Sequence, residues 1–284
     1  MKIRSSHQIL FLINLLLATS ASAATVDGIQ LHSSKSGKGP NTVILVHGWT
    51  CDERTWKSQV PVLAKNYRVI TLDLPGHGQS GSPEDGKMSM DLFARAIEAV
   101  RQEENADRVV LVGHSMGTAV IMQYARLYPE HTVALMFVDG SVTLPQDAKV
   151  KDSMLSFAKQ YADSLKVREA MVQSMFSSNT TQDVRNQVLS MILSAPAATA
   201  VGMMEAFVDP VIWKEDVFTQ PVLAMFSDVS LTPADRESDL EYMKTRFPHL
   251  DYVKMPGTGH FLMLEKPTEF NRLLMSFLDK LNYQ

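Results

Sequence analysis

Short apolar runs alternate with helical patterns along most of the chain. The runs are continuously apolar and rich in β-branched residues, which is typical of strands that are buried on both faces of a parallel sheet. The clearest predicted strands cover residues 43–46, 69–72, 109–112, 135–138 and 222–226, and a weaker one covers 252–255.

Amphipathic patterns of helical period lie between these runs. The predicted helices cover residues 55–65, 91–104, 116–128, 235–247 and 267–281. Strands that alternate with helices predict an α/β fold, in which helices cover a mostly parallel sheet. Residues 26–32 are expected to add an antiparallel edge hairpin before the first parallel strand.

Residues 142–220 interrupt this alternation, because no clear strand lies among them and the composition becomes helical and rich in methionine. An insert of this length between two strands is interpreted as a helical cap over the edge of the sheet. Methionine fills irregular apolar space, so these side chains either pack in the core or, for several of them, line a substrate pocket. They are Met154, Met171, Met175, Met191, Met203 and Met204.

The start of the chain has the order of a secretory signal peptide. Lys2 and Arg4 give it a positive charge, and residues 9–18 form a short apolar run. Small residues at 21–23 then precede a cleavage point before Ala24. The apolar run is shorter than the roughly 20 residues of a membrane span, which makes an uncleaved anchor the weaker interpretation. We expect export to the periplasm or the medium, without stable membrane insertion.

The mature part of about 260 residues is long enough for one large domain with a full core. The predicted organisation has four segments. They are a signal peptide at 1–23, the first part of the core at 24–141, the cap at 142–220 and the second part of the core at 221–284.

Charge and cysteine content exclude several classes of partner and site. The chain has a formal net charge of −4, which becomes −6 when Lys2 and Arg4 are removed, and it has no basic cluster. Nucleic acid is therefore not an expected partner. The single cysteine, Cys51, excludes an internal disulfide and a cysteine-rich metal site, and we interpret it as structural.

A serine lies between two glycines at the end of a predicted strand. Residues 113–117, G-H-S-M-G, match the pattern G-x-S-x-G and stand between a strand and a helix. In such a sharp turn the serine backbone is strained, and glycines on either side avoid clashes between Cβ atoms. A bare match often occurs by chance, but this context predicts Ser115 as a nucleophile.

A serine nucleophile needs a base that takes its proton. His260 lies in a glycine-rich loop after the weak sixth strand, where a base that comes late in the chain is expected. His47, His77 and His114 compete with it, but each is interpreted as shaping a turn or making a structural hydrogen bond. We therefore predict His260 as the base.

Two backbone N–H groups are candidates for an oxyanion hole. The N–H of Met116 follows the nucleophile at the start of a helix, and the N–H of Trp49 lies in the loop after the first parallel strand. The loss of one such donor typically costs about 3–4 kcal/mol of transition-state stabilisation.

Four motifs occur in a recognisable order: H-G-W at 47–49, D-L-P-G-H-G-Q-S at 73–80, G-H-S-M-G at 113–117 and G-H-F at 259–261. With these four motifs the chain resembles the α/β-hydrolases of the esterase, haloperoxidase and epoxide-hydrolase-like group. The resemblance implies an α/β-hydrolase fold, with a mostly parallel eight-stranded sheet flanked by helices and a helical cap after the sixth strand. It also implies a serine–histidine–acid triad, and Ser115 argues against relatives that use a nucleophilic aspartate.

The acid of the triad is the point at which the resemblance is ambiguous. In most relatives it follows the next-to-last strand, where this chain has Ser230, with Asp228 two residues earlier. Some relatives carry it one strand earlier, which corresponds to Asp139 here. We favour Asp139, with Asp228 and then Asp235 as alternatives, although many relatives keep an aspartate at the first position without a catalytic role. The acid has to be a buried carboxylate that orients His260.

Two other functions remain as alternatives. Residues 76–81 match G-x-G-x-x-G after a strand, which is typical of a dinucleotide-binding oxidoreductase. That site needs a helix that opens within the motif, whereas the helical pattern here starts only near Asp91. The second alternative is a sensor that holds a small ligand on the same fold and turns it over slowly or not at all.

The sequence thus predicts an exported serine hydrolase that acts on a small-molecule carboxylic ester or a related acyl compound. Ser115 attacks the carbonyl, His260 transfers the proton, and Asp139 or Asp228 orients His260. No metal or organic cofactor is expected. Ester, lactone, thioester, amide and lipid substrates stay open, because the cap carries no motif that identifies one.

Overall fold

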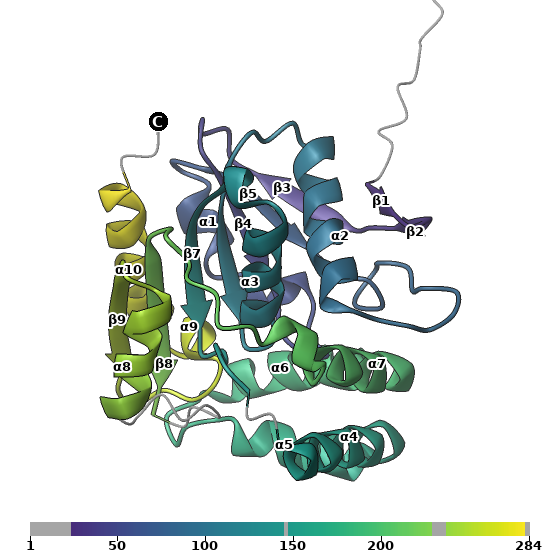
Figure 1. The fold of residues 1–284 in the computed structure, drawn as a ribbon. Coiled ribbons are helices and arrows are strands. Elements are labelled where there is room, and N and C mark those ends of the chain that lie inside the picture. The colour runs from purple at the N-terminus through teal and green to yellow at the C-terminus, as the bar shows by residue number, and fades with distance from the viewer. Residues whose placement is uncertain (1–23, 145–146, 229–236, 282–284) are drawn as a thin grey trace, which may run out of the picture.

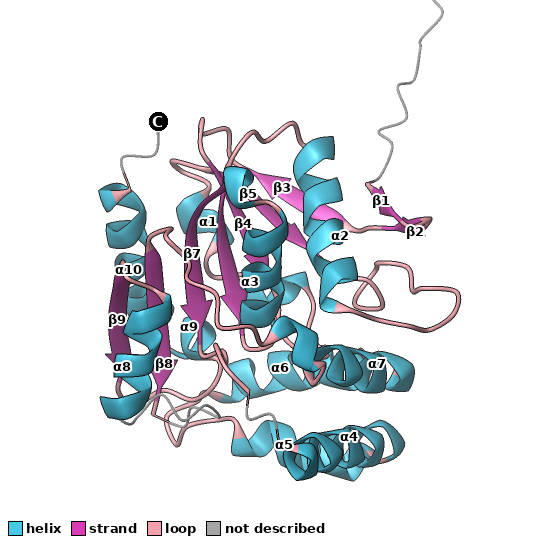
Figure 2. Ribbon diagram, in the orientation of Figure 1, coloured by secondary structure: helices cyan, strands magenta, loops and turns pink. Residues whose placement is uncertain are grey.

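The computed structural model describes residues 24–144, 147–228 and 237–281. The predicted signal peptide at 1–23 lies outside the described residues. The fold is a central sheet with helices on both faces and a layer of helices across one end, as Figures 1 and 2 show.

The main sheet has seven strands in the order β3-β5-β4-β6-β7-β8-β9, all parallel except β3, which runs antiparallel to β5. The six strands predicted from the sequence correspond to β4 to β9. The strands are β3 (Ser33–Ser36), β4 (Thr42–Val46), β5 (Arg68–Leu72), β6 (Val109–His114), β7 (Thr132–Val138), β8 (Val222–Ser227) and β9 (Leu250–Met255).

The described part of the sheet therefore has one strand fewer than the expected eight. The first two strands, β1 (Thr25–Val26) and β2 (Ile29–Gln30), form a separate two-stranded sheet. Asp27 and Gly28 turn the chain between them with φ values of 50° and 79°, as in a tight hairpin turn. The edge hairpin expected at 26–32 is thus a small separate hairpin, and β3 supplies the antiparallel edge.

Four of the five helices predicted around the sheet are confirmed, within a few residues at their ends. They are α2 (Met90–Glu103), α3 (Gly117–Leu127), α8 (Glu237–Arg246) and α10 (Pro267–Lys280). In Figure 1, α3 lies in front of the sheet and α1 lies behind it.

The helix predicted at 55–65 is interrupted. The structure has a 3-10 turn at Glu53–Trp56 and a separate short helix α1 (Val60–Leu63). Pro61 lies in the first turn of α1, where its missing N–H is tolerated. A helix continued from residue 55 would need that N–H and would bring the proline ring against the carbonyl of Lys57.

Four helices follow β7 before the chain returns to β8. They are α4 (Ala148–Asp163), α5 (Leu165–Ser174), α6 (Gln182–Ser194) and α7 (Ala197–Phe207). They lie across the carboxyl ends of the strands, at the bottom of Figure 1, and no strand lies among the described residues of this stretch. In chain order the cap follows the fifth strand of the main sheet rather than the sixth, because β1 and β2 do not join that sheet.

A buried arginine joins two of the cap helices. The guanidinium of Arg168 donates hydrogen bonds to the carbonyl oxygens of Tyr161 at 2.9 Å, Ala162 at 3.1 Å and Ala195 at 2.9 Å. These carbonyls lie at the carboxyl ends of α4 and α6, where the helix dipole favours a positive charge. Arg168 therefore holds the ends of two helices together inside the cap.

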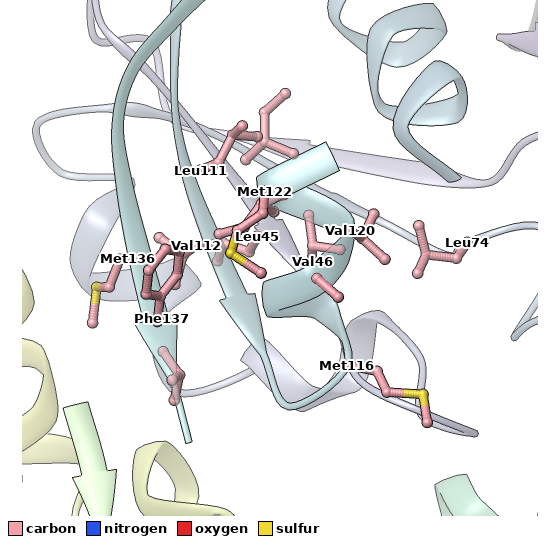
Figure 3. Close-up of a cluster of buried hydrophobic side chains, with 14 of the residues drawn as sticks. Leu45, Val46, Leu74, Leu111, Val112, Met116, Val120, Met122, Met136 and Phe137 are labelled. Atoms are coloured by element: carbon pink, nitrogen blue, oxygen red, sulfur yellow. The ribbon is translucent and has the colours of Figure 1, made fainter. Parts of the chain in front are cut away.

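The core lies between the sheet and the helices on its two faces. The central strands β4, β6 and β7 are almost wholly buried, and Figure 3 shows the side chains of Leu45, Leu111 and Phe137 beside Val120 and Met122 of α3. Strands buried on both faces explain why their sequences are continuously apolar. These findings confirm the predicted α/β-hydrolase architecture.

Within the described part of the chain, no single helix is both long and apolar enough to cross a membrane. Helices α6 and α7 pass the same length and hydropathy test only as a pair, which is bent by 91°.

Candidate active site

Ser115 lies at the sharp turn between β6 and α3. Its backbone has a φ of 54°, in the left-handed region that non-glycine residues rarely adopt. The flanking glycines are required by close packing, because a Cβ at Gly113 would lie 2.5 Å from the carbonyl oxygen of Gly117. A Cβ at Gly117 would lie 2.6 Å from the carbonyl oxygen of His47. The turn thus holds Ser115 in a strained conformation at the end of the strand.

His260 and Asp139 are hydrogen-bonded to each other. The Nδ1 atom of His260 lies 2.6 Å from Oδ2 of Asp139, and both residues are at most 2 % exposed. Asp139 directly follows β7 and has a φ of 48°. Its carboxylate also accepts hydrogen bonds from the backbone N–H of Ser227 at 2.8 Å and from the Ser227 hydroxyl at 3.1 Å. The carboxylate is therefore fixed on one side by β8 and faces the imidazole on the other.

The structure brings Ser115, His260 and Asp139 to the wall of one cavity of about 580 Å³. Trp49 and Met116, the two predicted oxyanion donors, line the same cavity. Among the described residues, neither of their backbone N–H groups donates a hydrogen bond within the protein. All five residues follow the carboxyl ends of parallel strands, which meet at one edge of the sheet.

Of the other two candidates for the acid, Asp228 is bonded to groups other than His260. Asp228 accepts a hydrogen bond from the backbone N–H of Gly257, lies 3.7 Å from the Lys254 ammonium, and has a side chain that is 43 % exposed. Asp235 lies outside the described residues. Of the two described candidates, only Asp139 has the buried position beside the imidazole that an orienting acid needs.

The loop that carries His260 is held from both sides. The His260 N–H donates to the carbonyl of Met175 in the cap at 2.7 Å. One oxygen of Glu265, at the end of α9 (Leu262–Glu265), accepts from the N–H of Gly259 at 2.9 Å and from the Ser177 hydroxyl at 2.7 Å. The cap, the histidine loop and α9 therefore meet at one carboxylate.

Close packing leaves no room for a side chain at Gly259. A Cβ there would lie 2.4 Å from the carbonyl oxygen of Met175 and 2.7 Å from Oε1 of Glu265. Sequence analysis did not identify Glu265 or Ser177, because they are 88 residues apart in the chain and no motif connects them.

The three competing histidines make structural hydrogen bonds. The His47 ring lies 2.9 Å from the Gly48 carbonyl through Nδ1 and accepts from the Leu74 N–H at 3.0 Å through Nε2. His114 donates through Nε2 to the His260 carbonyl at 2.9 Å. Burial lowers the pKa of His47, lowers that of His77 to about 3 and lowers that of His114 well below its usual value. All three are neutral at pH 7, which suits the structural roles that the sequence suggested.

The glycine-rich stretch at 76–81 is a loop, and α2 begins only at Met90. A Cβ at Gly78 would lie 2.1 Å from a carboxylate oxygen of Asp73, so this glycine allows the loop to fold around Asp73. The stretch therefore offers no helix N-terminus to a pyrophosphate, which a dinucleotide site requires.

Part of the methionine-rich cap faces the cavity. Met154, Met171, Met175 and Met204 line it, whereas Met191 and Met203 do not and are almost fully buried in the core. Four of the six methionines thus line the cavity, and the other two pack in the core.

Cys51 also lines the cavity, and burial raises the pKa of its thiol to about 12. The thiol stays protonated at pH 7, which makes it a poor nucleophile. Within the described ranges, no cluster of three or more histidine, cysteine, aspartate or glutamate residues is placed to hold a metal ion.

Comparison with known proteins places this geometry in a family. Residues 41–267 match the family model described as the alpha/beta hydrolase fold. The chain is 26% identical to a 2-hydroxy-6-oxo-6-(2'-aminophenyl)hexa-2,4-dienoic acid hydrolase of Metapseudomonas resinovorans, over 89% of each protein. It is 27% identical to a pimeloyl-[acyl-carrier protein] methyl ester esterase of Photobacterium profundum, over 85% of this chain and 96% of that protein.

A solved structure supports the same placement. A thermophilic esterase from Thermogutta terrifontis, with malate bound, superposes with a TM-score of 0.78 and 26% identity, over 93% of this chain and 98% of the other. The family match covers strands β4 to β9, the serine turn and the histidine loop. The chain is therefore a hydrolase and belongs to the alpha/beta hydrolase fold family.

Proposed function

We propose that this hydrolase cleaves a carboxylic ester through an acyl-enzyme formed on Ser115. The observation that carries the proposal is the buried hydrogen bond between His260 and Asp139, on the wall of the cavity that Ser115 also lines. A nucleophile, a base and an orienting acid are the three groups that acyl transfer to serine requires.

In the first half-reaction the Ser115 hydroxyl attacks the ester carbonyl, and Nε2 of His260 takes the hydroxyl proton. Nδ1 is held by Asp139, which leaves Nε2 for this transfer and stabilises the imidazolium. The N–H groups of Trp49 and Met116 bind the negative oxygen of the tetrahedral intermediate. When the intermediate collapses, His260 returns the proton to the leaving alkoxide, and the alcohol departs.

In the second half-reaction water replaces the alcohol. His260 takes a proton from the water as it attacks the acyl-enzyme carbonyl, and a second tetrahedral intermediate forms. Its collapse breaks the bond to the serine oxygen, which recovers the proton from His260. The products are a carboxylic acid and the free enzyme. The chemistry needs no metal or organic cofactor.

The names of two similar proteins support an ester as the substrate. The Photobacterium profundum relative and the Thermogutta terrifontis structure are both named as esterases. The Metapseudomonas resinovorans relative is named as the hydrolase of a dienoic acid. The ester assignment for this chain rests on the geometry of the site.

Labelling with a fluorophosphonate tests the nucleophile. We expect the wild-type protein to be labelled in a ratio of one to one and to hydrolyse short p-nitrophenyl esters with a burst of p-nitrophenol. The Ser115→Ala variant should lose both the label and the turnover. Equal labelling of the variant would contradict the assignment. Labelling without turnover of any short ester would favour the alternative of a ligand sensor.

We also propose that the protein is exported. The charge, apolar run and small residues at 1–23 support cleavage before Ala24. Expression in a bacterial host, followed by fractionation and mass spectrometry of the mature N-terminus, tests this. A protein that is found only in the cytoplasm and retains residues 1–23 would contradict the proposal.

A further inference from the structure

The cavity beside Ser115 is walled largely by apolar groups. It has a volume of about 580 Å³, which is in the range of pockets that enclose a small ligand. Methionines of the cap and aromatic rings from the cap and the core form much of the lining. A substrate that fills this space exchanges water for apolar surface, which favours an apolar substrate.

The charged groups of the cavity leave no partner for an anion. Among the described residues that line it there is no lysine or arginine. Its one carboxylate, Asp139, is bonded to His260 and to Ser227. An ionised carboxylate on a buried part of the substrate would lose its hydration, gain no counter-ion and lie near a second negative charge.

The position of the base indicates which part of an ester enters which end of the cavity. His260 has to give a proton to the leaving oxygen, so the alcohol part lies on the His260 side. There Phe261 has its ring centroid 5.5 Å from that of His260. The acyl part then extends away from His260. A second group of rings, those of Trp49, Phe157 and Tyr161, lines the same cavity.

That second group of rings offers little to a polar acyl chain. The Trp49 ring lies 4.4 Å from the Tyr161 ring and 6.2 Å from the Phe157 ring, between centroids. The Tyr161 hydroxyl is hydrogen-bonded to the Thr50 hydroxyl at 2.9 Å, and Nε1 of Trp49 donates to the carbonyl of Ala200 at 2.8 Å. The polar tips of Trp49 and Tyr161 are therefore already engaged, so these rings offer mainly apolar surface to a ligand in the cavity.

We propose that the substrate of this enzyme is an uncharged ester whose acyl group is an apolar chain, held against Trp49, Phe157 and Tyr161. An acyl chain that ends in a carboxylate is rejected. This inference rests on the proposed ester hydrolysis and adds the substrate class to it.

Three esters that share an unbranched six-carbon acyl chain test the role of charge. They are p-nitrophenyl hexanoate, the mono-p-nitrophenyl ester of adipic acid, and the methyl p-nitrophenyl diester of adipic acid. The second has an ionised carboxylate at pH 7, and the third has the same chain with that charge removed. We expect kcat/KM for the first and third to agree within about 10-fold, and that for the second to be lower by about 100-fold or more.

A gain-of-function variant tests the location. Phe157 is half-buried on α4, so a lysine there can reach both the cavity and solvent. Phe157→Lys should raise kcat/KM for the charged ester relative to the hexanoate by about 10-fold. The matched control is Ser156→Lys, which adds the same charge at the adjacent exposed position of the same helix and should leave the ratio unchanged.

The outcomes separate this inference from the proposed function. Turnover of all three esters at similar kcat/KM, with fluorophosphonate labelling intact, overturns the substrate class and leaves the serine mechanism standing. A diester as slow as the monoester overturns it as well, because the discrimination would then follow length. No turnover and no labelling overturn the proposed function, and the substrate class with it. The ester series on the wild-type protein decides the matter even where Phe157→Lys fails to fold.

Discussion

The backbone N–H of His260 donates a hydrogen bond of 2.7 Å to the carbonyl of Met175, which joins the predicted base to the cap. Glu265 strengthens this connection, because one of its oxygens accepts from both Gly259 and Ser177. The position of the imidazole thus depends on the cap as well as on the sheet, and the cap that encloses the substrate also holds the base.

Replacement of Glu265 should disturb the position of His260. In Glu265→Ala the N–H of Gly259 and the hydroxyl of Ser177 lose their acceptor, so we expect kcat to fall by about 10-fold or more while KM changes less. Glu265→Gln keeps an oxygen that can accept both bonds and should retain most of the activity. Steady-state kinetics and the rate of fluorophosphonate labelling measure both effects. An alanine variant with wild-type kcat, or a glutamine variant as slow as alanine, would contradict a positioning role.

Substitution of the two candidate acids should affect turnover to very different extents. Asp139→Asn removes the charge that faces the imidazole, and we expect kcat to fall by about 10³- to 10⁴-fold. Asp228→Asn serves as the control, since its side chain is 43 % exposed and bonds to Gly257 and Lys254 rather than to the imidazole. It should keep turnover close to that of the wild type. The reverse result with a p-nitrophenyl ester would move the acid to Asp228.

Acid should destabilise the fold through its buried histidines. The pKa of His77 falls from 6.5 to about 3 on burial. Between these two pH values the unfolded chain binds a proton at this residue and the native protein does not, so the free energy of unfolding decreases as the pH falls. The slope has an upper limit of about 1.4 kcal/mol per pH unit.

Urea denaturation at several pH values from about 7 to about 5 measures this slope. His77→Gln removes the titrating group and can still donate to the Pro75 carbonyl that Nδ1 of His77 contacts at 3.0 Å. Its stability should depend less steeply on pH than that of the wild type, while His47 and His114 maintain part of the dependence. Identical slopes in the two proteins would show that His77 is protonated in the folded state or exposed to solvent.

Arg168 should stabilise the cap. Arg168→Met leaves three carbonyl oxygens without their donor, and we expect the free energy of unfolding to fall by about 2–4 kcal/mol. Arg168→Lys keeps the charge but cannot span all three carbonyls, so an intermediate loss is expected. The exposed Arg272 supplies the control Arg272→Met, which should change stability by no more than about 0.5 kcal/mol. Urea denaturation followed by circular dichroism distinguishes these outcomes.

The sheet could be predicted from the sequence because each buried strand is a continuous apolar run. Strands β4 to β9 were identified in this way, and even the weak run at 252–255 lies within β9. The prediction of one helix at 55–65 was wrong because Pro61 divides it. The main sheet has seven strands among the described residues rather than eight, because β1 and β2 pair only with each other. These two features depend on a single local residue and on tertiary placement, which an apolar pattern does not encode.

The serine and the histidine were predictable from local motifs, whereas their surroundings were not. Asp139 and Asp228 follow neighbouring parallel strands, so the sequence places both near the same edge of the sheet. Only the folded structure shows that one carboxylate is buried against the imidazole and that the other lies near Lys254. Glu265 and Ser177 carry no signal of their own, because their importance arises from contacts between segments that are far apart in sequence.

The contacts of the histidine loop with residues 175–177 limit how this enzyme can be engineered. A chimera that exchanges the entire helical insert for that of another family member would discard the Met175 carbonyl and the Ser177 hydroxyl, and with them two of the anchors of the loop. Grafts that keep this short segment and splice new helices on either side of it would leave the anchors intact. The exchangeable parts of the insert are therefore its flanks rather than the whole.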